Sequence, residues 1–264
     1  MSNIAFTEPR TLTFFAIERE DTLVAGAKKE LAQMVQYARP RFPFGRLYRE
    51  FRNYNKADPT EHITSLKSYI QIAPFLIPKD RESHRPIIRH PDLHLPNIFV
   101  SNDFKIIRMI DWQHCFVLPL FLRAGIPKYS RNYDDEEPER LTTLRLSDNL
   151  AELIEEEKVT AMEQWSKHRI HFYFLAASAN PNKVHFRACI EDWSIFRSRI
   201  FQHAGEPWEG DSVTLKADLI QVMQDWKKLV QPVPEELLPC PISYTEKQVE
   251  DCLRISARQR DADV

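Results

Sequence analysis

The sequence predicts a mainly α-helical protein with one small β-hairpin near its middle. Over most of the 264 residues, apolar side chains recur at three- and four-residue steps, which is the period of an amphipathic helix. One segment alone has the composition of sheet. Residues 97–101 and 105–112 are rich in Ile, Val, Phe and Met, and the turn-forming sequence SNDF connects them.

Helices are expected over residues 21–38, 58–70, 160–178, 184–203, 214–230 and 245–257. Two of them begin with a specific signal. Asp58 stands before Pro59 at the first helical position, and Thr245 and Gln248 have the spacing of a capping box. Residues 1–258 are expected to form one domain, and residues 259–264 are expected to be a frayed tail.

The composition excludes several classes of protein. A hydrophobic fraction of 43% and a charged fraction of 28% are ordinary for a soluble globular protein. The net charge of −2 predicts no basic face and hence no nucleic-acid partner. No apolar run approaches the ~18 residues of a transmembrane segment, and the N-terminus lacks the pattern of a targeting signal. The four cysteines are widely spaced, which predicts reduced thiols.

Five polar residues gather around the predicted hairpin: His90, Asp92, His94, Asn97 and Asp111. Asn97 and Asp111 stand almost symmetrically about the turn, so in an antiparallel pair they are expected to face each other with backbones ~5 Å apart. That separation allows an amide oxygen and a carboxylate to share one Mg²⁺, whose ligands lie ~2.1 Å from the metal. Asp92 lies on the loop that leads into the hairpin.

The D-x-x-x-x-N spacing of Asp92 and Asn97 is that of the catalytic loop of protein kinases. In those enzymes the Asp accepts the proton of the attacking hydroxyl, while the Asn and an Asp at a strand end hold magnesium. Two other interpretations stay open. A hairpin can simply end in polar residues, or His90, Asp92 and His94 can bind zinc in a metal-dependent hydrolase.

The motif H-x-D-L-H-x-x-N followed by I-D-W resembles the aminoglycoside/choline phosphotransferase group. The similarity is closer to a fungal branch that includes altered inheritance of mitochondria protein 9. The stretches that carry it are YIQIAPFLIPKD, RHPDLHLPNIFVS, IDWQHCFVLPLFLRAGIP, PWEGDSVTLKADLI and PCPIS. The resemblance covers about residues 10–258. The wider group usually has glycine where Pro91 and Pro96 stand.

The resemblance implies the C-terminal lobe of a protein-kinase-like fold and ATP-dependent phosphoryl transfer to a small-molecule hydroxyl. Asp92 would be the catalytic base and His90 a structural member of the catalytic loop. Asn97 and Asp111 would hold Mg²⁺ and thereby contact ATP. The fungal branch implies a mitochondrial location, with the cytoplasm as the alternative.

The N-terminal nucleotide lobe of such an enzyme is expected to be missing. The five glycines are scattered and form no glycine-rich loop. Lys28, in the sequence VAGAKK, is expected to be a solvated helix lysine rather than the strand lysine of a kinase. Such a chain would be a fragment, a truncated gene model or a degenerate paralogue. Impaired catalysis and self-association through the exposed lobe face are then expected.

The alternative function is a non-catalytic pseudokinase or interaction module. The identity of the acceptor is open. Acidic runs at residues 134–139 and 155–157 would favour a cationic acceptor, or they are solvated surface.

Overall fold

The computed structural model describes residues 19–51, 53–90, 92–113, 115–130, 154–230 and 238–262. The described chain is mainly helical with small antiparallel sheets, which confirms the predicted class. In its first half lie α1 (Arg19–Tyr37), α2 (Arg46–Phe51), α3 (Pro59–Ile72), η1 (Ala73–Leu76), η2 (Arg81–His84), β1 (Pro86–Arg89), η3 (Leu95–Asn97), β2 (Ile98–Val100), β3 (Ile106–Met109), β4 (Phe116–Pro119), α4 (Leu120–Arg123) and η4 (Lys128–Ser130). In its second half lie α5 (Glu155–Ala179), α6 (Lys183–Ile190), α7 (Ser194–Gly205), α8 (Val213–Gln224), α9 (Trp226–Leu229) and α10 (Glu246–Ala262).

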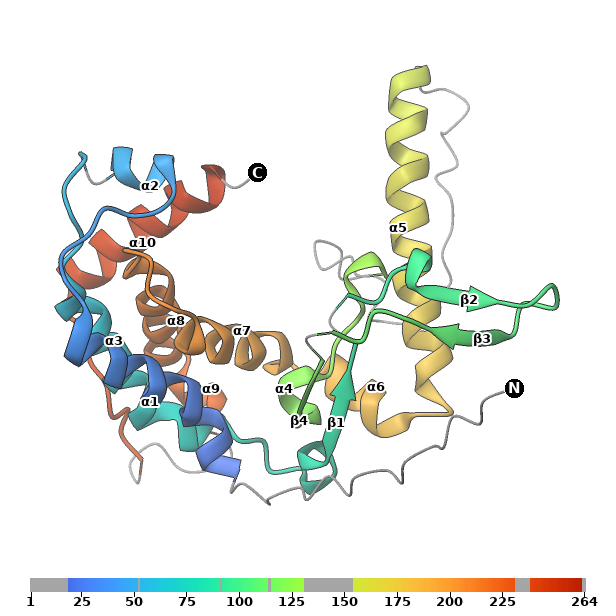
Figure 1. Cartoon of the computed structure of the whole chain (residues 1–264), viewed down its shortest axis with the longest axis horizontal. Coiled ribbons are helices and arrows are strands. Elements are labelled where there is room, and N and C mark those ends of the chain that lie inside the picture. Colours follow the sequence, from blue (N-terminus) through green and yellow to red (C-terminus); the bar gives the residue numbers. More distant parts are fainter. Residues whose placement is uncertain are drawn as a thin grey trace, which may run out of the picture.

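The helices α1, α3, α7, α8 and α10 gather at one end of the molecule, and the strands with α5 and α6 lie at the other (Figure 1). Helix α3 packs between α1 and α8, and α10 packs on α8. The short helix α4 joins the two ends, because it contacts both α7 and the strands β1 and β4. The ribbon of β2 and β3 projects away from the helical end (Figure 1).

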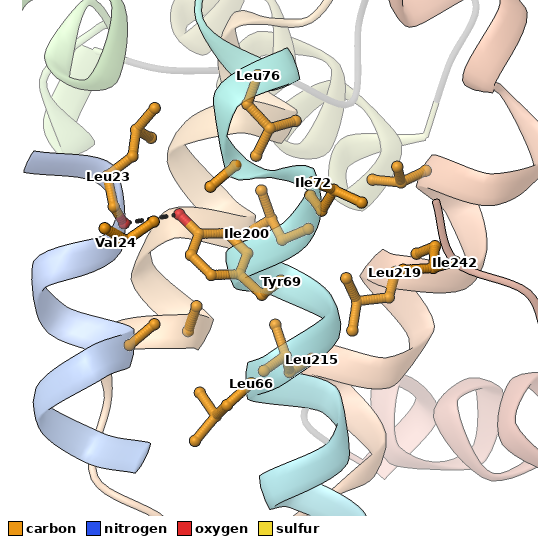
Figure 2. Close-up of a cluster of buried hydrophobic side chains, with 14 of the residues drawn as sticks. Leu23, Val24, Leu66, Tyr69, Ile72, Leu76, Ile200, Leu215, Leu219 and Ile242 are labelled. Carbon is orange, nitrogen blue, oxygen red and sulfur yellow. Dashed lines mark hydrogen bonds between the residues drawn. The ribbon is translucent and has the colours of Figure 1, made fainter. Parts of the chain in front are cut away.

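The main core is built from the inward faces of α1, α3, α7 and α8. Figure 2 shows side chains of these helices meeting around Tyr69 on α3. The Tyr69 hydroxyl donates a hydrogen bond of 3.0 Å to the carbonyl oxygen of Leu23 on α1. Burial raises the pKa of this hydroxyl, so it stays protonated and keeps donating. Tyr69 therefore connects the two helices by packing and by a polar bond.

Both predicted helix starts are confirmed. The side chain of Asp58 accepts a hydrogen bond of 2.8 Å from the backbone N–H of Thr60, and hydrogen bonding to the side chain and then the backbone of Thr60 lowers the pKa of the carboxyl. At the start of α10, the Thr245 hydroxyl accepts from the N–H of Gln248, and the Gln248 side chain accepts from the N–H of Thr245 at 2.9 Å. Helix α10 continues to Ala262, into the segment expected to fray.

Two predicted helices are each divided in the structure. The segment 184–203 forms α6 and α7, and the segment 214–230 forms α8 and α9. Glu191 adopts an extended backbone after α6, and its carboxylate forms an ion pair with the buried Arg197. Asp225 leaves helical geometry between α8 and α9. The helices α8 and α9 pack on the same core, and the apolar period runs on from α6 into α7, so the sequence pattern did not reveal either break.

The strands form two separate two-stranded sheets. β2 pairs with β3 in the predicted hairpin, whereas β1 and β4 form a second antiparallel pair that was not predicted. Pro86 pairs with Pro119 at the end of this second sheet, so its two strands are 33 positions apart at that point and no short turn connects them. Among the described helices, none is long and apolar enough to cross a membrane.

His62 on α3 is a buried histidine whose two ring nitrogens find no hydrogen-bond partner in the described structure. Desolvation lowers the pKa of its imidazole from 6.5 to about 4, although the charges of Asp211 and Glu61 act in the opposite direction. The folded protein therefore binds this proton more weakly than the unfolded chain. Stability is unaffected by this group above pH ~6.5 and falls as the pH drops from ~6.5 to ~4.

Replacing His62 with leucine should remove this pH dependence. Between pH 7 and pH 5, the free energy of unfolding of the parent should fall by about 2 kcal/mol more than that of His62→Leu. Urea titrations at both pH values measure the difference. A His185→Gln variant serves as the control, because it removes another low-pKa histidine and leaves the contribution of His62 in place. Equal pH dependence in the parent and His62→Leu would contradict the assignment.

Candidate functional site

The candidate site is the loop that connects β1 to β2, together with the residues that follow β3. β1 ends at Arg89 and delivers His90 into the interior, where only 8% of the residue is exposed. The short turn η3 then carries Asn97, which is also buried, directly into β2. The backbone N–H of Ile110, just after β3, donates to the carbonyl of Asn97 at 3.1 Å. The loop and the end of β3 are therefore held side by side.

His90 is the centre of the loop. Its Nδ1 accepts a hydrogen bond of 3.2 Å from the backbone N–H of Asp92, so the ring proton resides on Nε2. Nε2 then donates to the carbonyl oxygen of Ile110 at 2.8 Å. The ring also packs edge-on against Trp112, with centroids 4.8 Å apart. The expected structural role of His90 thus has a physical basis in two hydrogen bonds and one aromatic contact.

Asp92 and Asn97 are joined through the backbone of the loop. The Asn97 side-chain Nδ2 donates to the carbonyl oxygen of Asp92 at 3.0 Å. The Nδ1 of His94 lies 2.8 Å from the same carbonyl and 3.1 Å from Asn97 Nδ2. The Asp92 side chain is 67% exposed, and one oxygen of its carboxylate lies 3.5 Å from Nδ1 of His94. The loop therefore fixes the Asp92 backbone and presents its carboxylate to solvent.

The expected pairing of Asn97 with Asp111 is wrong by one residue. Ile98 pairs with Met109 in the ribbon, and Asn97 bonds to Ile110. The turn pairs Ser101 with Lys105, and an irregularity between Phe99 and Val100 then shifts the register by one residue, which brings Ile110 rather than Asp111 opposite Asn97. Asp111 follows directly, with an exposed side chain and a left-handed backbone at φ 66°. Such a backbone costs a non-glycine residue about 1 kcal/mol, and strain of this kind clusters at functional sites.

The apolar composition of the ribbon of β2 and β3 would predict burial, but most of its residues are exposed. All four residues of β3 are exposed, and Phe104 at the turn is 89% exposed. The large apolar rings of Phe99 and Trp112 would predict a place in the core, but the two residues are exposed to 44% and 38%. Arg108 covers the ring of Phe99 at 5.1 Å, and the indole N–H of Trp112 donates to the Met109 carbonyl. Both aromatic side chains therefore make these contacts with residues of β3.

Asn97 and Asp111 carry oxygen donors, whereas both ring nitrogens of His90 are already engaged. Asp111 offers a carboxylate, and the Asn97 amide is oriented by the bonds of its nitrogen, so its oxygen is turned away from them. Oxygen donors of this type suit Mg²⁺. Both ring nitrogens of His90 are already bonded, which leaves none for zinc. In the described parts of the chain, no three His, Cys, Asp or Glu side chains group as metal ligands. The zinc hypothesis therefore loses its central ligand.

A cavity of about 700 Å³ adjoins the loop, and no motif of the sequence predicts it. His90 and Leu93 of the loop line one part of it, and two arginines, Arg89 and Arg123, line another. Arg89 lies next to the motif in the sequence, but Arg123 is distant from it. Nothing in residue spacing signals that β4 and α4 return to the loop and bring these two charges together.

Other predicted features have mixed outcomes. Lys28 is a solvated helix lysine as expected, with 57% of its side chain exposed. The four cysteines form no disulfide, and Cys252 is the buried one. Pro91, His114 and the acidic run at 134–139 lie outside the described residues. The acidic residues 155–157 are exposed in the first turn of α5 and do not line the cavity.

Comparison with known proteins gives distant relatives. The chain is 27% identical over 246 residues to subtelomeric hrmA-associated cluster proteins from two strains of Aspergillus fumigatus. The match covers 92% of this chain and 46% of each relative, so the chain spans about half the length of the curated relatives it matches. No family model matches the chain. No solved structure matches it either.

Replacing His90 with phenylalanine should destabilise the protein. The variant keeps an aromatic ring against Trp112 but leaves the Ile110 carbonyl and the Asp92 N–H without their partner. Losing these two part-buried hydrogen bonds, at about 1 kcal/mol each, should lower the free energy of unfolding by about 2 kcal/mol, measured by urea titration. The matched control is Asp92→Asn, whose exposed side chain should change stability by less than about 0.5 kcal/mol. Equal losses in both variants would refute the central position of His90.

Proposed function

We propose that this chain carries the catalytic loop of a kinase-like phosphotransferase, which moves a phosphoryl group from ATP to the hydroxyl of a small molecule. Asp92 is the base, Asn97 and Asp111 hold Mg²⁺, and His90 positions the loop. The observation that carries the proposal is the bonding within the loop. Asn97 and His90 bind the backbone on either side of Asp92, while the Asp92 carboxylate itself makes no hydrogen bond to a described residue and is exposed.

The chemistry follows from this arrangement. The exposed Asp92 carboxylate can accept the proton of an acceptor hydroxyl while the oxygen forms a bond to the γ-phosphorus and the bond to ADP breaks. Its position is set by the backbone bonds of its neighbours, so the carboxylate is free to interact with the acceptor. Bound Mg²⁺ would neutralise phosphate charge during transfer. Asp111 and the amide oxygen of Asn97 are the groups that would hold it.

One observation favours the alternative of a non-catalytic pseudokinase or interaction module. The five glycines of the sequence form no glycine-rich loop, so this chain lacks the segment that covers the phosphates in kinases. The apolar ribbon of β2 and β3, exposed along its length, is consistent with a surface that another segment or copy covers. The location of the protein, mitochondrial or cytoplasmic, is left as the expectation drawn from the resemblance.

The metal site can be tested on this chain without nucleotide. Titration with Mn²⁺, followed by electron paramagnetic resonance, should show one bound ion. Asp111→Asn should weaken its binding by about tenfold or more, because the substitution removes the only charged ligand proposed. Asp103→Asn is the matched control, since Asp103 lies at the other end of the same ribbon and pairs with Lys105 at 2.7 Å. Identical Mn²⁺ affinity in the two variants would exclude the proposed site.

Phosphoryl transfer is tested by incubating the protein with Mg-ATP and a panel of small hydroxyl compounds and measuring the phosphorylated product. Asp92→Asn should lower the turnover rate by about 10²–10⁴-fold, the usual contribution of a general base. Asp251→Asn, a change in an exposed carboxylate of α10, should leave the rate unaltered. If calorimetry with millimolar Mg-ATP shows no heat and no product forms, the non-catalytic alternative is the better description.

A further inference from the structure

The cavity beside the candidate loop has an unusual charge pattern. Its described lining includes the two arginines Arg89 and Arg123, and it includes no aspartate or glutamate. The polar side chains Ser198 and Gln202 reach it from α7. Aromatic and aliphatic residues form most of the remaining wall. A pocket of this composition is electropositive and partly shielded from water.

Arg123 has lost hydration without gaining an anionic partner in the described structure. Its guanidinium lies 4.1 Å from the centroid of the Phe116 ring, and its Nε is buried with no hydrogen-bond partner. No described carboxylate lies within ion-pair distance of it. Desolvation, followed by the charge of Arg89, lowers the pKa of Arg123. A half-buried guanidinium whose Nε lacks a partner is stabilised by an anion that enters the cavity.

Arg89 is held in place from two sides. One guanidinium nitrogen donates to the carbonyl of Gly125 at 2.6 Å, and the other lies 3.4 Å from Nε2 of His185. Burial, together with the charges of Arg89 and Arg85, lowers the pKa of His185 to about 4, so this imidazole is neutral at pH 7. Arg89 lies at the end of β1, and its bond to Gly125 attaches its side chain to the short turn that follows Arg123. The two cations are therefore part of one rigid wall.

We propose that this cavity binds the acceptor and that the acceptor is a small hydroxylated acid, whose carboxylate or phosphate group is held by Arg123 and Arg89. This inference rests on the proposed function. The same cavity is lined by His90 and by Leu93, the residue after Asp92, so the hydroxyl end of a bound acid would lie at the loop. Guanidinium groups bind carboxylate and phosphate oxygens through paired N–H donors, and a cationic acceptor would be repelled.

The experiment measures binding of four small probes to the purified chain at pH 7.5 without nucleotide. The probes are glycerate, glycerol 3-phosphate, neutral glycerol and cationic choline. Calorimetry or ligand-observed NMR should show that at least one anionic probe binds about tenfold or more tightly than glycerol and choline. The stronger of the two anions identifies the charged group as carboxylate or phosphate. Equal binding of all four probes, or preference for choline, would overturn the inference.

Variants of Arg123 connect this binding to the cavity. Arg123→Gln should weaken anion binding by about tenfold or more. Arg123→Lys keeps the charge and should retain the preference for anions over glycerol at reduced affinity. The control is Arg254→Gln on α10, where the arginine is exposed and pairs with Asp251, and this variant should bind as the parent does. Circular dichroism verifies that each variant is folded. Undiminished anion binding in folded Arg123→Gln would refute the site.

The outcomes separate this inference from the proposed function. Anion binding that depends on Arg123, without transfer from Mg-ATP to any hydroxyl compound, would leave the cavity site standing and remove the catalytic proposal. Transfer that requires Asp92 but has the same KM for neutral and anionic acceptors, in both the parent and Arg123→Gln, would support the catalytic proposal and remove the anionic acceptor.

Discussion

The hydrogen bond from the His90 ring to the carbonyl of Ile110 is the constraint on which the candidate site depends. It connects two segments that are 20 residues apart, the loop before β2 and the end of β3. Because the other ring nitrogen accepts from the Asp92 backbone, one buried imidazole fixes both the strand end and the loop. The result is an ordered backbone that carries an exposed carboxylate. Rigid support beneath a chemically active group is what transfer reactions require, since a misplaced base loses most of its effect.

Local signals in the sequence predicted the helices, their caps and the hairpin. Asp58, Pro59 and the pair Thr245 and Gln248 act within one turn, so their chemistry is readable without tertiary structure. Features that depend on distant contacts were not readable. The break after Glu191 is stabilised by Arg197 from the next helix. The second sheet pairs strands that no turn sequence connects. The apolar period shows which face of a helix is apolar. It does not show where one helix ends and the next begins when the period continues through both.

The candidate site shows the same division at smaller scale. Spacing placed His90, Asp92 and Asn97 on one loop, and the structure unites them through the bonds of that loop. The register of Asp111 could not be obtained from spacing, because it depends on which residues pair at the turn and on the irregularity between Phe99 and Val100. The arginine-lined cavity needs β4 and α4 to return beside β1, which is a property of the fold. The sequence motif thus identifies the candidate polar residues of the loop, whereas the cavity beside them can be identified only from the fold.

The projecting ribbon of β2 and β3 has a consequence for the handling of this protein. Within the described residues, each of these strands pairs with one neighbour, so the outer backbone N–H and C=O groups of both strands offer a template for a strand from another molecule. Such edge-to-edge growth leads toward fibrillar aggregates, and the exposed Ile106, Ile107 and Phe104 would stabilise it. The charge of Lys105 is compensated by Asp103, so Arg108 leaves the ribbon with a net positive charge, which opposes the approach of a like-charged copy. Colloidal stability should therefore fall at high ionic strength, where that repulsion is screened.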